Sequence, residues 1–128
     1  MKKLIIMICV SLCSLFLIGC TSTSGSNIVT GTKRSAVNAD EVKIYYQFPE
    51  NYEVIGIVKA TGESWTTQKS LDLAVMELKA QAGKIGANGV VITDAGAKNE
   101  GYVLIGNTVV SDDSQAVSGT AIYVYPNK

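Results

Sequence analysis

The chain contains no histidine, and its cysteines, Cys9, Cys13 and Cys20, all lie near the amino terminus. Histidine is the commonest general base and a frequent zinc ligand, so its absence excludes Ser-His and Cys-His nucleophile pairs. Since no cysteine follows Cys20, the remainder can form no internal disulfide, and a metal site there would need carboxylate or amide ligands, which suit hard cations. We therefore predict no catalytic residue, no metal and no cofactor, and we expect the protein not to be an enzyme.

Excess charge of either sign is also missing, since 11 basic side chains balance 11 acidic ones. If Lys2 and Lys3 are removed with a leader peptide, 9 of the 11 basic side chains remain and the net charge becomes −2. Binding to nucleic acid requires a basic patch that displaces condensed counterions. The composition therefore predicts no nucleic-acid partner.

The amino terminus has the pattern of a bacterial lipoprotein signal peptide. Lys2 and Lys3 precede an apolar run over residues 4–18, and residues 17–20 read LIGC, which resembles a lipobox. As a helix the run spans about 22 Å, short of the roughly 30 Å hydrocarbon core of a bilayer. This favours a cleaved signal peptide over residues 1–19, and the alternative is a retained transmembrane helix.

The lipobox resemblance implies cleavage between Gly19 and Cys20, diacylglyceryl transfer to the Cys20 sulfur and acylation, for example by palmitate, of the new amino group. Membrane lipid is then a partner through Cys20, and more than one acyl chain gives a stable anchor. Thr21 stands where an aspartate would favour inner-membrane retention. We predict an outer-membrane anchor with the domain facing the periplasm, or a cell-membrane anchor if the organism has no outer membrane.

Residues 20–40 have a linker composition, rich in Ser, Thr, Gly and Asn without a sustained apolar period. The sequence predicts the lipidated cysteine followed by a flexible tether, whose root-mean-square reach would be about 25 Å. Lys33 and Arg34 make only a weak patch for anionic headgroups. The globular domain is predicted to cover residues 41–128.

Within this domain, β-rich runs and turn residues predict strands and one helix. Residues 52–60 alternate, with Tyr52, Val54 and Val58 on one face, and Gly56 suggests a bulge. Residues 90–94 have the apolar start of a central strand. The expected strands are 42–46, 52–60, 90–94, 102–110 and 117–125, the last two paired as a hairpin. The fold class is α+β, one helix packed on a small, mainly antiparallel sheet in the order β-β-α-β-β-β.

The helix is predicted from Ser70, a suitable N-cap, to about Gly86, which suits the left-handed position after the last turn. Asp72 would complement the macrodipole in the first turn, and Gly83 would allow close packing. An apolar stripe at helical spacing faces the sheet. Its members are Leu71, Ala74, Val75, Leu78, Ala82 and Ile85.

Other candidate site residues have structural explanations. Gly83, Gly86 and Gly89 follow a helix, whereas phosphate loops open one, so C-cap and turn roles are favoured over an anion nest. Asp112 and Asp113 are interpreted as a solvated turn rather than paired acids or calcium ligands.

Exposed or buried placement of the aromatic side chains is left open by the sequence. Trp65 either packs as a hydrophobic staple on the helix start, which we favour, or is an exposed contact residue. The strand tyrosines either cover the core edge or form a partner-binding patch. They are Tyr45, Tyr46, Tyr123 and Tyr125.

Residues 42–125 resemble the superfamily that includes the Rcs stress-sensor lipoprotein and the YbjQ-like domains. The resemblance depends on residues 52–56 (YEVIG) and residues 78–91 (LKAQAGKIGANGVV). The resemblance implies an α+β fold. The lipid anchor, the flexible tether and the missing catalytic side chains predict an envelope-anchored, non-catalytic interaction or stress-sensing module with an envelope protein partner. The alternative is a self-assembling structural domain of the YbjQ-like kind, hence a homo-oligomer, and an enzyme of unknown type comes third.

Overall fold

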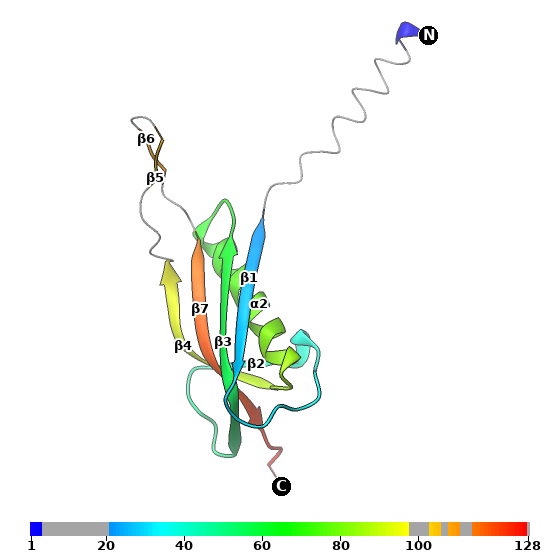
Figure 1. The fold of residues 1–128 in the computed structure, drawn as a ribbon, viewed down its shortest axis with the longest axis vertical. Helices are drawn as coiled ribbons and strands as arrows, with labels where there is room; N and C mark the ends of the chain where they lie inside the picture. The colour runs from blue at the N-terminus through cyan, green and yellow to red at the C-terminus, as the bar shows by residue number, and fades with distance from the viewer. Residues whose placement is uncertain (4–20, 98–102, 106–107, 111–113, 128) are drawn as a thin grey trace.

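β-Branched runs and one helical stripe assemble into a helix packed on one face of a five-stranded sheet, as the computed structural model shows (Figure 1). The structure describes residues 1–3, 21–97, 103–105, 108–110 and 114–127. The predicted α+β class is confirmed. The elements are β1 (Ser22–Val29), the 3-10 turn η2 (Ala39–Glu41), β2 (Lys43–Tyr45), β3 (Tyr52–Glu63), α2 (Thr67–Lys84), β4 (Gly89–Ala97), β5 (Val103–Ile105), β6 (Thr108–Val110) and β7 (Gln115–Val124).

The sheet has the order β1-β3-β7-β4-β2 and is mainly antiparallel, with β2 and β4 as its parallel pair. The hairpin expected between residues 102–110 and 117–125 is wrong. β5 pairs with β6 instead, while β7 lies between β3 and β4 at the centre of the sheet. The connection from β4 to β7 contains its own chain reversal, between β5 and β6, and this leaves both sides of β7 free for long-range pairing.

The amino-terminal segment differs from the flexible tether expected over residues 20–40. β1 pairs antiparallel with β3 along its whole length, from Ser22 opposite Glu63 to Val29 opposite Gly56. A strand at a sheet edge with both faces largely exposed needs no apolar period, so its polar composition resembled a linker. The domain described by the structure therefore begins at Ser22.

Helix α2 begins earlier than predicted. The Thr66 hydroxyl caps it by accepting a hydrogen bond from the Lys69 amide at 3.2 Å, whereas Ser70 is buried within the first turns. Asp72 consequently lies beyond the first turn, which has no acidic residue. Gly86 has a φ of 84°, so the predicted left-handed position after the helix is confirmed.

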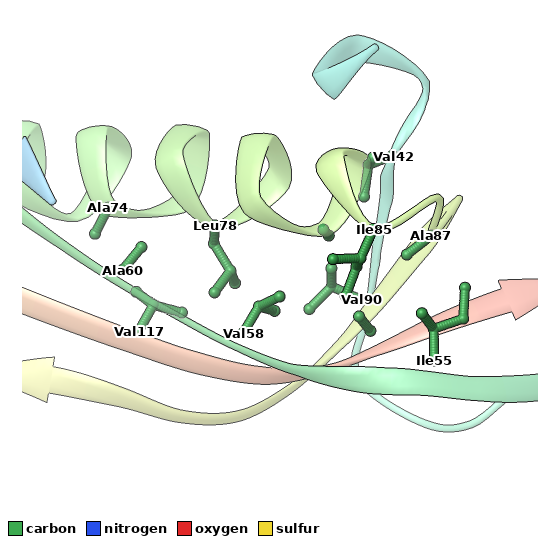
Figure 2. Close-up of a cluster of buried hydrophobic side chains, with 12 residues drawn as sticks. Val42, Ile55, Val58, Ala60, Ala74, Leu78, Ile85, Ala87, Val90 and Val117 are labelled. Carbon is green, nitrogen blue, oxygen red and sulfur yellow. The ribbon is translucent and has the colours of Figure 1, made fainter. Parts of the chain in front are cut away.

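The core lies between α2 and the sheet (Figure 2). From the helix, Ala74, Leu78 and Ala82 are fully buried, as their spacing predicts. Small helix residues let the sheet approach closely, and Leu78 fills the space between them. The remaining buried members of this cluster are Val42, Ile55, Val58, Ala60, Ile85, Ala87, Val90, Val117 and Ala121.

Candidate functional site

An apolar patch lies on the sheet face opposite α2. A bulge between Val54 and Gly56 shifts the alternation of β3, as Gly56 had suggested. Tyr52, Val54 and Ile57 therefore share the outer face, while Ile55 and Val58 are buried on the helix side. The faces predicted for residues 52–60 are wrong from Ile57 onward, because each residue after a bulge changes sides.

The patch continues onto the neighbouring strand and loop. Ile28 on β1 lies directly opposite Ile57 and is 61% exposed, and Phe48 stacks on Tyr52 with ring centroids 4.8 Å apart. Exposed apolar residues that are contiguous mark contact surfaces more often than isolated ones do. We define the apolar patch as Ile28, Phe48, Tyr52, Val54 and Ile57.

Strand β1 forms an edge of the sheet beside this patch. It has 8 residues, STSGSNIV, with neither a charged residue nor a proline. Natural edge strands are usually protected by charges, prolines, bulges or short length. The opposite edge, β2, has only 3 residues. Among the described residues, β1 is therefore the long edge that could accept a further strand.

The polar half of the same face begins beyond the patch. Ser24, Ser26, Lys59 and Thr61 line an open depression of about 190 Å³ over β1 and β3. Lys59 lies opposite Ser26 and supplies the positive charge of this depression. The edge strand is thus flanked by an apolar patch towards Val29 and by a hydroxyl-rich surface towards Ser22.

A second cluster, at the end of the sheet where β3 begins, joins Arg34 to Glu53, Tyr123 and Tyr125. An Arg34 amino group donates to a Glu53 carboxylate oxygen at 2.7 Å and to the Tyr125 hydroxyl at 2.8 Å. That hydroxyl donates to the same carboxylate oxygen at 2.7 Å, and the Arg34 guanidinium lies 4.0 Å from the Tyr123 ring centroid. The Arg34 cluster fastens the chain between β1 and β2 to the sheet.

The electrostatics of this cluster disfavour Glu53 as a general base. The hydrogen bonds from Arg34 and then from Tyr125 lower the pKa of the Glu53 carboxyl, which weakens it as a base. Donation to Glu53, followed by burial, raises the pKa of the Tyr125 hydroxyl, which makes the phenolate harder to form. Donation to the Glu53 carboxylate likewise raises the pKa of Arg34. The same three hydrogen bonds hold the Arg34, Glu53 and Tyr125 side chains together.

The predicted site residues are placed as follows. Trp65 is 75% exposed, so the staple that we favoured is wrong, and whether this exposed side chain contacts a partner stays a prediction. Tyr46 is exposed, Tyr45 is half-buried with its ring against Gly89, and Tyr123 packs against the core. Tyr125 is 42% exposed, and its ring contacts that of Tyr123 edge to face with centroids 5.2 Å apart.

Some predicted residues lie outside the part of the chain that the structure describes. They are the proposed cleavage and lipid-attachment residues, Gly19 and Cys20, and the acidic pair Asp112 and Asp113. Among the described residues, no group of His, Cys, Asp or Glu could hold a metal ion. No helix in the described ranges is long and apolar enough to span a bilayer.

The fold and surface together define a small α+β domain, one helix against a five-stranded mixed sheet, with an unprotected edge strand. No protein-family model matches the chain, and no curated protein matches it. Among solved structures, it is similar to the Francisella virulence factor FvfA, with a TM-score of 0.55 and 16% sequence identity. The match covers 78% of this chain and 97% of FvfA, and at this identity it shows the fold alone. The resemblance to the Rcs sensor and YbjQ-like domains stays a prediction.

Proposed function

We propose that the protein is a non-catalytic interaction module of the bacterial envelope, anchored by lipid on Cys20, that binds an extended segment of an envelope protein along β1. The observation that carries this proposal is the uncharged 8-residue edge strand beside the apolar patch. In β-strand addition, backbone groups of the edge supply affinity and neighbouring side-chain pockets supply specificity. The anchor itself is supported by the lipobox resemblance of residues 17–20.

The chemistry of the chain supports a binding role. The sequence has no histidine, and the carboxylate of Glu53 is already engaged by Arg34 and Tyr125. The position of Thr21 supports an outer membrane location, with the domain in the periplasm. Stress sensing would be one use of such an anchored, non-catalytic module.

In-cell photocrosslinking from β1 tests the proposal. A photoreactive amino acid replaces Ser26, an exposed residue of β1, and in a control strain replaces Met76, which is 65% exposed on α2. We expect a specific adduct with a second envelope protein from position 26 and none from position 76. Adding Ile28→Lys, which places a charge beside the edge, should reduce that adduct at least severalfold without unfolding the domain, because Ile28 is 61% exposed.

The other outcomes are equally informative. Adducts solely between copies of this chain from position 26 would replace the partner with self-assembly, the structural alternative. Equal labelling from positions 26 and 76, or adducts insensitive to Ile28→Lys, would reject β1 as the binding edge.

A further inference from the structure

One end of the sheet gathers chain segments that are distant in sequence. Ser22 pairs with Glu63, and Gly62 pairs with Gln115, which in turn pairs with Ala97. The start of β1, the end of β3, the start of β7 and the end of β4 therefore lie at the same end of the molecule (Figure 1). The carboxyl terminus lies at the opposite end (Figure 1).

Lipid on Cys20 would be attached at this end. Only Thr21 separates Cys20 from the first residue of β1. Consecutive Cα atoms are 3.8 Å apart, so this connection spans at most about 7 Å. Because residues 22–29 are paired in the sheet, they cannot lengthen the connection between Cys20 and the domain. The bilayer would therefore lie against this end of the domain.

The surface at this end suits a lipid headgroup region. Trp65 follows β3 two positions after Glu63, the partner of Ser22, and its side chain is 75% exposed. Tryptophan favours the membrane interface, where its ring is buried and its N–H stays hydrated. The Glu63 carboxylate accepts hydrogen bonds from the Ser22 hydroxyl at 2.8 Å and from the Ser114 hydroxyl at 3.2 Å.

The β5–β6 hairpin adds to this end. β4 ends at Ala97 and β7 begins at Gln115, in the same row as Thr23 and next to Ser22, and β5 and β6 lie beyond this end of the sheet (Figure 1). Its strands, VLI and TVV, contain no charged residue. Burial of charge near lipid is costly, and residues 103–110 carry none, while the charged Lys98, Glu100, Asp112 and Asp113 lie closer in sequence to the sheet strands.

We propose that this end of the domain docks on the surface of the bilayer that holds the lipid, with Trp65 in the headgroup region. This rests on the Cys20 anchor of the proposed function. The strands then stand away from the membrane, which places Ile28 about 20 Å from Ser22 along β1 at roughly 3.3 Å per residue. Docking therefore leaves the apolar patch and the edge of β1 open to a partner in the periplasm.

Fluorescence of the single tryptophan tests the docking. The membrane-extracted protein is reconstituted in phosphatidylethanolamine and phosphatidylglycerol vesicles with or without brominated lipid, and its acylation is checked by intact mass. We expect Trp65 emission at shorter wavelength than in the unfolded chain, quenching by brominated lipid, and protection from acrylamide of at least threefold. A matched control, Trp65→Phe with Phe48→Trp, moves the probe to the opposite end, where acrylamide should reach it and brominated lipid should not.

The possible results separate the two proposals. An acylated protein whose Trp65 is as accessible to acrylamide as the probe at position 48 would overturn docking and leave the anchor intact. An unmodified mass, unchanged by Cys20→Ala, would overturn the anchor and the docking with it. Inserting a flexible Gly-Ser segment between Thr21 and Ser22 should weaken quenching of Trp65 by brominated lipid. Equal quenching with and without the insertion would show that the short connection is not what holds Trp65 at the bilayer.

Discussion

At the scale of single residues, Arg34 connects three parts of the chain that are distant in sequence. Its amide donates to the Ile85 carbonyl at 3.1 Å, and its side chain binds Glu53 on β3 and Tyr125, the residue that follows β7. The sequence had suggested only weak contact of Arg34 with headgroups. No local pattern could indicate its partners in the fold, because they lie 19 and 91 positions away in the sequence.

Acid should weaken the Arg34 cluster. The hydrogen bond from Arg34 lowers the pKa of Glu53 in the folded protein below its unfolded value of about 4.3. The stabilisation is therefore complete above the unfolded pKa and is lost as pH falls through the folded pKa. We expect Glu53→Gln to lower the urea midpoint at pH 7 and to flatten its fall between pH 5 and pH 2. The control is Glu50→Gln, an exposed change near the same end; equal pH profiles for the two variants would exclude this role.

At the scale of elements, sequence reasoning predicted α2 well and β1 not at all. The helix has an apolar stripe and a terminal glycine, two local signals that need no knowledge of the partner. β1 has neither signal. It is held in the sheet by backbone pairing with β3, which requires no apolar pattern in its side chains. The apolar patch was missed for a related reason: a bulge at Gly56 was suspected, but its effect on the faces of β3 depends on register with β7.

The turn after α2 gives a sharp test of this packing. A Cβ at Gly86 would lie 2.5 Å from Arg34 backbone and side-chain atoms, and its φ of 84° is unfavourable for other residues. Gly86→Ala should lower the free energy of unfolding by more than about 1–2 kcal/mol. Gly96→Ala is the control, because a Cβ added there would meet no atom within 4 Å, and it should change stability by less than about 0.5 kcal/mol. Urea unfolding measures both, and equal effects would refute the close approach.

At the scale of the whole molecule, composition and periodicity sufficed for the α+β class, but not for the topology. The order β1-β3-β7-β4-β2 places the last strand at the centre, between strands far from it in sequence. Turn residues before β7 favoured a local hairpin. Such residues predict where the chain reverses direction, but they do not indicate which strands pair with each other. The core of such a sheet is assembled by non-local pairs, whose formation no short window of sequence describes.

The boundary of the folding unit follows from this topology. A fragment of residues 41–128, the domain expected from composition, lacks β1 and Arg34 and exposes the edge of β3, a 12-residue strand. We expect it to be less stable than a fragment of residues 21–128 by several kcal/mol, out of the roughly 5–15 kcal/mol typical of domains, and to aggregate.

A milder variant, Asn27→Ala, removes the 2.7 Å hydrogen bond from Asn27 to Gln81 on α2 and should cost about 1 kcal/mol while the fold is kept. Urea midpoints and m-values of the three proteins measure these effects. Identical unfolding curves for the 41–128 and 21–128 fragments would mean that residues 22–40 are a detachable tether. The short connection between the anchor and the domain would then not exist.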